Sequence, residues 1–289
     1  MLWQEAGAEQ CGADSFPPRS QQFRTLSAAL FGIALLACCA LLGELWRTNA
    51  FDQQGWYNAW DAALLRLVNR HADHWPSFDT AAVFFAQENL LKGAPIVCLY
   101  WIAFFHPLPS RSEQLRRRAT LVTALPLAVL SVLLARALAA SMPFRERPLR
   151  TFALHFQVPH TASASALYGW SSFPSDHATL FVGMSLGLLF ASSLWGWLAI
   201  VYTIFCIIGP RLYLGIHWPS DLAAGALLGA VMVLPAAFSR FQAWSWQIAH
   251  RSWSRFPGLT AVSAFLISYE LTNLFDGPIR IASALLKHH

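Results

Sequence analysis

Charged side chains are scarce in this sequence: they make up 12% of its 289 residues, while hydrophobic residues make up 56%. A soluble domain carries about 25% charged residues. The composition therefore argues against a water-soluble protein and favours an integral membrane protein. The formal net charge of +5 comes from basic residues that are scattered between apolar runs. Because they form no continuous basic face, we expect no nucleic-acid partner.

Cysteine is scarce as well, with five in the chain. Four of them lie inside apolar segments, where cysteine behaves as a small hydrophobic residue: Cys38, Cys39, Cys98 and Cys206. Their spacing matches neither a zinc site nor a disulfide framework. The sequence therefore predicts no metal and no other cofactor.

Long apolar runs, by contrast, recur along the whole chain. Residues 25–43 carry no charge and are long enough to cross the hydrocarbon core of a bilayer. The uncharged run 178–209 is too long for one span and divides into two at Ser192–Gly196. Three further spans are predicted at 84–105, 119–140 and 222–238.

These runs predict an all-α fold, a polytopic membrane helix bundle with about six transmembrane helices. We expect residues 1–24 to form a cytoplasmic tail and residues 25–240 to form the membrane domain. The core of that domain would lie at residues 80–240. Residues 241–289 would add an interfacial segment and, in one of two interpretations, an extra span.

Two segments are less regular than these spans. Residues 61–70 have helical periodicity and follow several aromatic residues, which indicates an interfacial helix with an aromatic anchor. Residues 259–275 are apolar but short and contain Glu270, so they form either a seventh span or an interfacial hairpin. Glu88 and Lys92 stand four residues apart, and we interpret them as an ion pair rather than as the edge of a functional site.

Basic residues set the expected orientation of the chain. The densest group lies in a short loop between two spans and should face the cytoplasm: Arg111, Arg116, Arg117 and Arg118. Counting spans from that loop places three other polar clusters together on the outer surface: Arg145–Pro148, Pro174–His177 and Arg211–Asp221. Ionisable groups among apolar segments are costly and by default indicate a functional site. We therefore expect a multi-pass membrane protein with one site facing the exterior.

The spacing of His217 and Asp221 suggests a pair that works together. Trp218 precedes a proline and is biased away from helical geometry, whereas Pro219 suits the first position of a helix. Asp221 would then lie in the first helical turn, where its carboxylate can hold one imidazole nitrogen and leave the other as a nucleophile. A simpler interpretation is that Asp221 only caps the helix beside a loop histidine.

The other two clusters supply groups suited to an anionic substrate. Ser175 is a natural N-cap, and a helix N-terminus with free N–H groups binds anions. His177 in that first turn can give a proton to a leaving oxygen, while simple capping explains Ser175 and Asp176 equally well. Arg147 and Arg211 can grip phosphate oxygens in bidentate fashion, unless they merely snorkel to lipid headgroups.

Together these residues predict covalent phosphoryl transfer. His217 attacks phosphorus, His177 protonates the leaving oxygen, and water then hydrolyses the phosphohistidine. The arginines and the helix end supply positive charge, so no metal is needed.

In this arrangement the sequence resembles the type 2 phosphatidic acid phosphatase family, which includes membrane lipid phosphatases and vanadium haloperoxidases. The resemblance covers residues 80–240 and rests on three motifs in the family's order: Arg147-Pro148, Pro174-Ser175-Asp176-His177, and Arg211 with His217 and Asp221. It implies hydrolysis of a lipid phosphate or pyrophosphate at the outer face of a bacterial inner membrane. A polyprenyl pyrophosphate, as in undecaprenyl carrier recycling, is the leading substrate. Phosphatidic acid, phosphatidylglycerol phosphate or a lipid A phosphate would suit the same site.

The sequence departs from the family pattern at two positions. Ala140 stands where the first motif has a basic residue. Arg136 or Arg145 could replace that cation, and we favour Arg145 as a phosphate-binding residue. Pro210 stands where the third motif has a serine, so a supporting hydroxyl is lost.

Other classes of protein remain open at this point. A vanadium haloperoxidase would share the site, but such proteins are soluble and the apolar runs disfavour that class. A lipid phosphotransferase would pass the phosphoryl group to an acceptor other than water. A transporter or assembly scaffold would use no chemistry at all. The expected partners are a membrane lipid and the bilayer, and the sequence predicts no particular protein partner.

Overall fold

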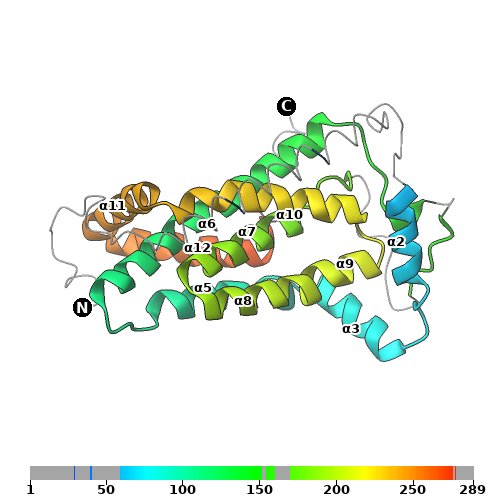
Figure 1. Ribbon diagram of the computed structural model, residues 1–289, viewed down its shortest axis with the longest axis horizontal. Helices are drawn as coiled ribbons and strands as arrows, with labels where there is room; N and C mark the ends of the chain where they lie inside the picture. The colour runs from blue at the N-terminus through cyan, green and yellow to red at the C-terminus, as the bar shows by residue number, and fades with distance from the viewer. Residues whose placement is uncertain are drawn as a thin grey trace.

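The computed structural model describes residues 59–151, 154–159 and 170–275, together with Ala29, Ala40 and Gly277. Every regular element in these residues is helical, and most helices run along the long axis of one bundle (Figure 1). The predicted all-α class is confirmed for this part of the chain. The predicted tail at 1–24 lies outside the described residues, and the predicted first span at 25–43 lies almost wholly outside them.

The elements follow one another in this order: α2 (Ala59–Asn69), α3 (Pro76–Gln87), α4 (Asn89–Lys92), α5 (Ala94–Phe105), α6 (Arg111–Ser141), the short η2 (Pro148–Arg150), α7 (Asp176–Ala191), α8 (Ser193–Tyr202), η5 (Thr203–Ile208), α9 (Gly209–Tyr213), α10 (Pro219–Val233), η6 (Leu234–Ala237), α11 (Ser239–Arg255) and α12 (Pro257–Thr272). Among the described residues, three helical stretches are long and apolar enough to cross a membrane: Arg111–Ser141, Ser193–Tyr213 and Pro219–Ala237. The helices α5 and α7 are apolar but shorter. The count of six or seven spans therefore stays a prediction.

The helix α7 lies at the centre of the bundle, against α10, and their contact depends on glycine. A Cβ atom added to Gly225 would lie 2.3 Å from the carbonyl oxygen of Ser175. One added to Gly229 would lie 2.1 Å from the carbonyl oxygen of Thr179. Small residues allow two membrane helices to bring their backbones this close. The close packing fixes the N-terminal end of α7 beside the start of α10.

The uncharged run 178–209 turns where the sequence predicts. The helix α7 ends at Ala191 and α8 begins at Ser193, so Ser192 alone makes the turn. A Cβ atom on Gly196 would lie 2.2 Å from the Cα atom of Leu189. A glycine is therefore required for the two helices to fold back on each other so tightly.

A π-helical stretch precedes Pro210 and accommodates it in the helix. The segment Thr203–Ile208 is π-helical and leads directly into α9, in which Pro210 lies within the first two positions. Proline has no N–H group, and its ring clashes with the carbonyl four residues earlier in an α-helix. Widening the preceding turn relieves that clash, and π turns are frequent next to functional sites. Arg211 follows immediately.

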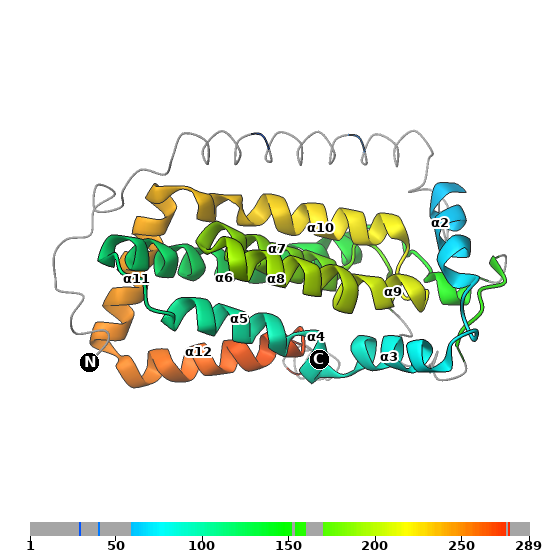
Figure 2. The ribbon, with the colours of Figure 1, turned by 60° about the horizontal axis from the view of Figure 1, so that its bottom comes forward.

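The two ends of the bundle differ. The helix α2 lies across one end and α11 lies at the other (Figures 1 and 2). The predicted interfacial helix at 61–70 corresponds to α2, which buries Asp61 and Leu65. The segment 259–275 forms most of one continuous helix, α12, beside α5, where Trp101 Nε1 donates to Ser268 Oγ at 3.1 Å. With 16 residues, α12 is shorter than the three candidate spans, so a seventh span here stays a prediction.

Candidate active site

The three polar clusters predicted from the sequence meet at the end of the bundle that α2 covers. They come from the loop after α6, the N-terminus of α7 and the segment from α9 to α10. The backbone N–H of Ser175 donates to the carbonyl oxygen of Asp221 at 3.1 Å. Nη1 of Arg147 lies 3.5 Å from Nε2 of His217. Residues that are far apart in the sequence thus form one site.

His217 is held by a backbone carbonyl. Its Nδ1 lies 2.9 Å from the carbonyl oxygen of Ser172, whereas Oδ2 of Asp221 is 3.6 Å away. A carbonyl oxygen only accepts hydrogen bonds, so Nδ1 carries the proton and Nε2 keeps its lone pair. Burial lowers the pKa of His217 below its ordinary value, and Asp221 offsets this in part. The lone pair of Nε2 therefore faces Nη1 of Arg147, and the role of His217 as a nucleophile stays a prediction.

The carboxylate of Asp221 differs in role from the expected one. It is fully buried, and Oδ2 accepts from the backbone N–H of Trp218 at 2.8 Å, which caps α10. It also accepts from Oγ of Ser172, whose carbonyl holds the imidazole of His217. The expected direct hydrogen bond from Asp221 to His217 is replaced by this route through Ser172. The sequence carries no signal for Ser172, because it holds His217 through its backbone carbonyl rather than through its side chain.

Arg145 is a buried structural cation. Its Nη2 pairs with Asp61 at 2.7 Å, and its Nη1 pairs with Asp221. The guanidinium carbon lies 5.4 Å from the ring centroid of Trp218 and 5.9 Å from that of Phe173. With a fully buried side chain between two carboxylates, Arg145 does not fit the phosphate-binding role that we favoured from the sequence.

Asp61 is a site residue that the sequence reasoning missed. Its two oxygens accept from the backbone N–H and the hydroxyl of Ser220, at 2.8 Å and 2.6 Å. These bonds attach α2 to the start of α10. A signal was present, because Asp61 shares the buried face of an amphipathic helix with Ala62 and Leu65. A carboxylate on such a face needs a buried partner.

His177 is paired directly with its neighbouring carboxylate. Its Nδ1 lies 2.8 Å from Oδ1 of Asp176, and within the described part of the chain its buried Nε2 has no hydrogen-bond partner. Oδ2 of Asp176 lies 3.3 Å from Nη2 of Arg136. Ser175 is the N-cap of α7 and accepts from the backbone N–H of Ala178 at 3.4 Å. His177 thus has one anchored nitrogen and one available nitrogen.

Two buried arginines supply the positive charge. Arg147 and Arg211 each donate Nη1 to a backbone carbonyl at 2.7 Å, those of Ile216 and Ile207 respectively. Burial lowers the pKa of Arg147, and the charges of Asp176 and Asp221 partly offset that effect. Arginine normally titrates so far above neutral pH that it stays charged here. Nε of Arg147 is buried without a protein partner among the described residues, and is available to an anionic ligand.

Lys92 borders the same site. It ends the short helix α4. Burial lowers the pKa of His177 to about 3, the charge of Arg211 acts in the same direction, and that of Lys92 adds the smallest effect, while Asp176 opposes them. From the sequence we interpreted Glu88 and Lys92 as an ion pair rather than as the edge of a functional site. The position of Lys92 favours the second alternative for that residue.

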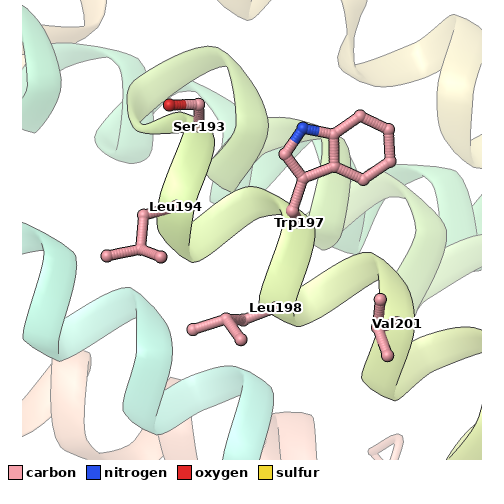
Figure 3. A pocket seen from close by; sticks show the side chains of 5 residues that line it. All are labelled: Ser193, Leu194, Trp197, Leu198 and Val201. Carbon is pink, nitrogen blue, oxygen red and sulfur yellow. The ribbon is translucent and has the colours of Figure 1, made fainter.

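A shallow apolar pocket lies elsewhere, on α8 (Figure 3). It is lined by Ser193, Leu194, Trp197, Leu198 and Val201. These residues are at the opposite end of the helical stretch Ser193–Tyr213 from Arg211, and none of them is titratable. The pocket is separate from the histidines and takes no part in their chemistry.

The described residues hold no cluster of histidine, cysteine or carboxylate side chains that could bind a metal ion. What the site does contain is a neutral histidine, a carboxylate-paired histidine and two buried arginines in a bundle of apolar helices. These are groups suited to binding an anionic substrate and to phosphoryl transfer.

Comparison with known proteins shows that residues 120–253 match the PAP2 superfamily. Undecaprenyl-diphosphatase BcrC of Bacillus subtilis is 25% identical over 170 residues, which cover 59% of this chain and 78% of that protein. The putative undecaprenyl-diphosphatase YbjG of Escherichia coli is 24% identical over 192 residues, covering 63% and 88%. The bacitracin transport permease protein BcrC of Bacillus licheniformis is 39% identical over 66 residues, covering 22% and 31%. No solved structure matches the chain.

Proposed function

We propose that this protein hydrolyses a polyprenyl pyrophosphate at the outer face of the membrane through a phosphohistidine intermediate. The observation that carries the proposal is the state of His217. Its Nδ1 is fixed on the carbonyl of Ser172 at 2.9 Å, and its Nε2 is turned toward Arg147. The names of two relatives, both undecaprenyl-diphosphatases, support the choice of substrate.

In the first step, the lone pair on Nε2 of His217 attacks the terminal phosphorus. A P–N bond forms while the P–O bond to the bridging oxygen breaks. The bridging oxygen leaves with the lipid phosphate and takes a proton from Nε2 of His177. Arg147, Arg211 and the N–H groups at the start of α7 stabilise the charge on the remaining phosphoryl oxygens.

In the second step, water replaces the histidine. The neutral Nε2 of His177 takes a proton from the attacking water, and the new P–O bond forms as the P–N bond breaks. The electron pair of that bond returns to Nε2 of His217. Inorganic phosphate leaves, and His177 is again protonated for the next substrate.

The proposed orientation rests on the two ends of α6. The arginine cluster lies in its N-terminal part and the site lies beyond its C-terminal end. A helix of 31 residues is about 46 Å long, enough to separate the two faces of a bilayer. Positive residues favour the cytoplasmic side, which leaves the site on the other face. Exposed aromatic side chains occur near the site, as at a membrane interface: Trp60, Trp75, Phe78, Phe144 and Trp170.

The test is phosphate release by the purified protein from a panel of lipid phosphates in detergent micelles. The panel should contain undecaprenyl pyrophosphate, phosphatidic acid and phosphatidylglycerol phosphate. We expect the fastest release from the pyrophosphate and none from the His217→Ala variant. No release from any lipid, or undiminished release by His217→Ala, would contradict the proposal.

A phosphotransferase is the second candidate, because His217 could pass its phosphoryl group to an acceptor other than water. Adding a second lipid alcohol to the same assay separates the two. Phosphate that appears on the added alcohol would identify a transferase. The permease name of one relative makes transport a further alternative, and it predicts no phosphate release at all.

A further inference from the structure

We infer that Arg136 replaces the basic residue missing at Ala140, and that it does so as a positioning residue for His177 rather than as a phosphate ligand. It would act through Asp176 and would itself be held by the turn that follows α12. The inference rests on the proposed function, because it assigns His177 the role of proton donor.

Arg136 lies on the same face of α6 as Ala140. Residues four apart on a helix lie one above the other, separated by about 5.4 Å along the axis. The missing cation is therefore supplied one turn earlier on the same helix. The long side chain of arginine spans such a distance, and its planar fork suits a carboxylate.

The contacts of Arg136 lead to the acid and not to the phosphate cradle. Nη2 lies 3.3 Å from Oδ2 of Asp176 and donates to the carbonyl oxygen of Leu274 at 2.7 Å. The other oxygen of Asp176 accepts from both Nδ1 and the backbone N–H of His177, each at 2.8 Å. Asp176 thus divides its two oxygens between Arg136 and His177.

This division fixes how His177 presents its proton. A proton donor in this position must be the imidazolium, with one N–H on Asp176 and the other on the leaving oxygen. A carboxylate that holds one nitrogen orients the ring and favours the charged form, and here it opposes burial and the charge of Arg211, which together lower the pKa of His177 to about 3. Arg136 keeps that carboxylate in place, since Asp176 is otherwise 28% exposed at its side chain and could turn toward solvent.

The turn after α12 provides a rigid acceptor for Arg136. Leu271 and Leu274 are almost fully buried, and Leu274 and Phe275 have φ angles of 51° and 58°. Side chains rarely adopt this left-handed region unless their surroundings hold them there. A Cβ atom on Gly93 would lie 2.8 Å from Cα of Thr272, so the end of α12 is packed tightly against the start of α5. This turn lies beyond residues 120–253, the part that matches the superfamily.

The activity test compares two substrates that differ in the basicity of their leaving group. A lipid alkyl monophosphate expels an alkoxide and needs a proton donor, whereas p-nitrophenyl phosphate expels a stable phenolate and does not. We expect Arg136→Gln to lower kcat on the alkyl phosphate by about 10- to 100-fold. KM should stay near the wild-type value, the loss on p-nitrophenyl phosphate should be much smaller, and Arg136→Lys should recover part of the activity.

Coupling through Asp176 is tested with the double variant Arg136→Gln/Asp176→Asn. If Arg136 acts through Asp176, the double variant is no slower than Asp176→Asn alone, because residues that act as a unit are not additive. The matched control is Arg118→Gln, at the other end of α6, which loses a similar bond to the carbonyl of Phe104 (3.1 Å) and should keep wild-type activity.

Three kinetic results would overturn the inference: an equal loss on both substrates, a raised KM with unchanged kcat, or additive effects in the double variant. A readout that does not depend on activity is ¹⁵N NMR of the histidine-labelled protein, with His177 assigned by His177→Asn. The protonated Nδ1 signal of His177 should weaken in Arg136→Gln and stay unchanged in Arg118→Gln. An unchanged signal in Arg136→Gln would overturn the inference even if the enzyme acted on none of the lipids tested. Absence of phosphate release by the wild type would contradict the proposed function instead.

Discussion

His217 and His177 both lie beside an aspartate, yet the protein supports them in different ways. His217 is 4% exposed, and its Nδ1 rests on a backbone carbonyl with the carboxylate of Asp221 3.6 Å away. His177 is 19% exposed at its side chain, and its Nδ1 rests directly on a carboxylate oxygen at 2.8 Å. A carbonyl favours a neutral ring, whereas a direct carboxylate favours a charged one. The first suits a nucleophile. At the second, the carboxylate favours the proton that a donor needs, but burial and the charge of Arg211 oppose it and lower the pKa of His177 to about 3.

The two aspartates beside these histidines also differ in their surroundings. Asp221 is saturated by Arg145, Ser172 and the backbone of Trp218, all in a closed interior. Asp176 is shared between His177 and Arg136 near the surface. One end of the site is therefore fixed by a buried network around Asp221. The other end is fixed by a short relay, the contacts from Arg136 through Asp176 to His177.

The largest effect should come from the nucleophile. His217→Gln removes the only atom that we expect to bond to phosphorus, so kcat should fall by about 10⁴-fold or more. Phosphate release from the lipid pyrophosphate measures this directly. The control is His250→Gln, on α11 at the opposite end of the bundle, which should retain full activity. Comparable losses in both variants would point to a general defect rather than to a nucleophile.

The proton donor should matter less than the nucleophile. His177→Asn keeps the size of the side chain but cannot give a proton, and we expect a loss of about 10²- to 10⁴-fold on a lipid substrate. The loss should shrink when the leaving group is a nitrophenolate. Steady-state rates on both substrates test the assignment, and a loss that is the same for both would remove His177 from that role.

The buried network should govern stability more than the relay does. Arg145→Met leaves Asp61 and Asp221 without their shared cation and should destabilise the protein by about 3–5 kcal/mol. Thermal unfolding in detergent micelles measures the change. The control Arg66→Met alters an exposed arginine on α2 and should leave the midpoint unchanged. A wild-type midpoint for Arg145→Met would mean that this cation does not hold the site together.

The smallest effect concerns pH. Because burial lowers the pKa of His217 below 6.5, its reactive neutral form is already complete at neutral pH. Only the acidic limb of kcat/KM should depend on this group, with activity rising as pH increases through a midpoint below 6.5. A pH–rate profile between pH 4 and 8 checks this, and a midpoint at or above 6.5 would contradict the burial argument.

The helical class and the three polar clusters could be read from the sequence, because ionisable residues are rare in apolar segments. The residues that hold these clusters in place could not be predicted from the sequence. Ser172 acts through its carbonyl, which no residue type encodes. Asp61 lies 84 residues from Arg145 and 159 residues from Ser220, the partners that it binds. From the sequence we favoured Arg145 over Arg136 as the substitute for the missing cation. The structure distinguishes the two arginines by their burial. The side chain of Arg145 is fully buried between two carboxylates, whereas that of Arg136 is 19% exposed and pairs with Asp176.

The most direct test of the account is to trap the covalent intermediate. Undecaprenyl pyrophosphate labelled with ³²P at its terminal phosphorus should be mixed with the protein and quenched in alkali, in which phosphohistidine survives. We predict labelled protein in the wild type, with the label mapped to His217 by peptide mass spectrometry, and none in His217→Gln. Label on another residue, or phosphate release with no labelled protein at any time point, would contradict His217 as the nucleophile.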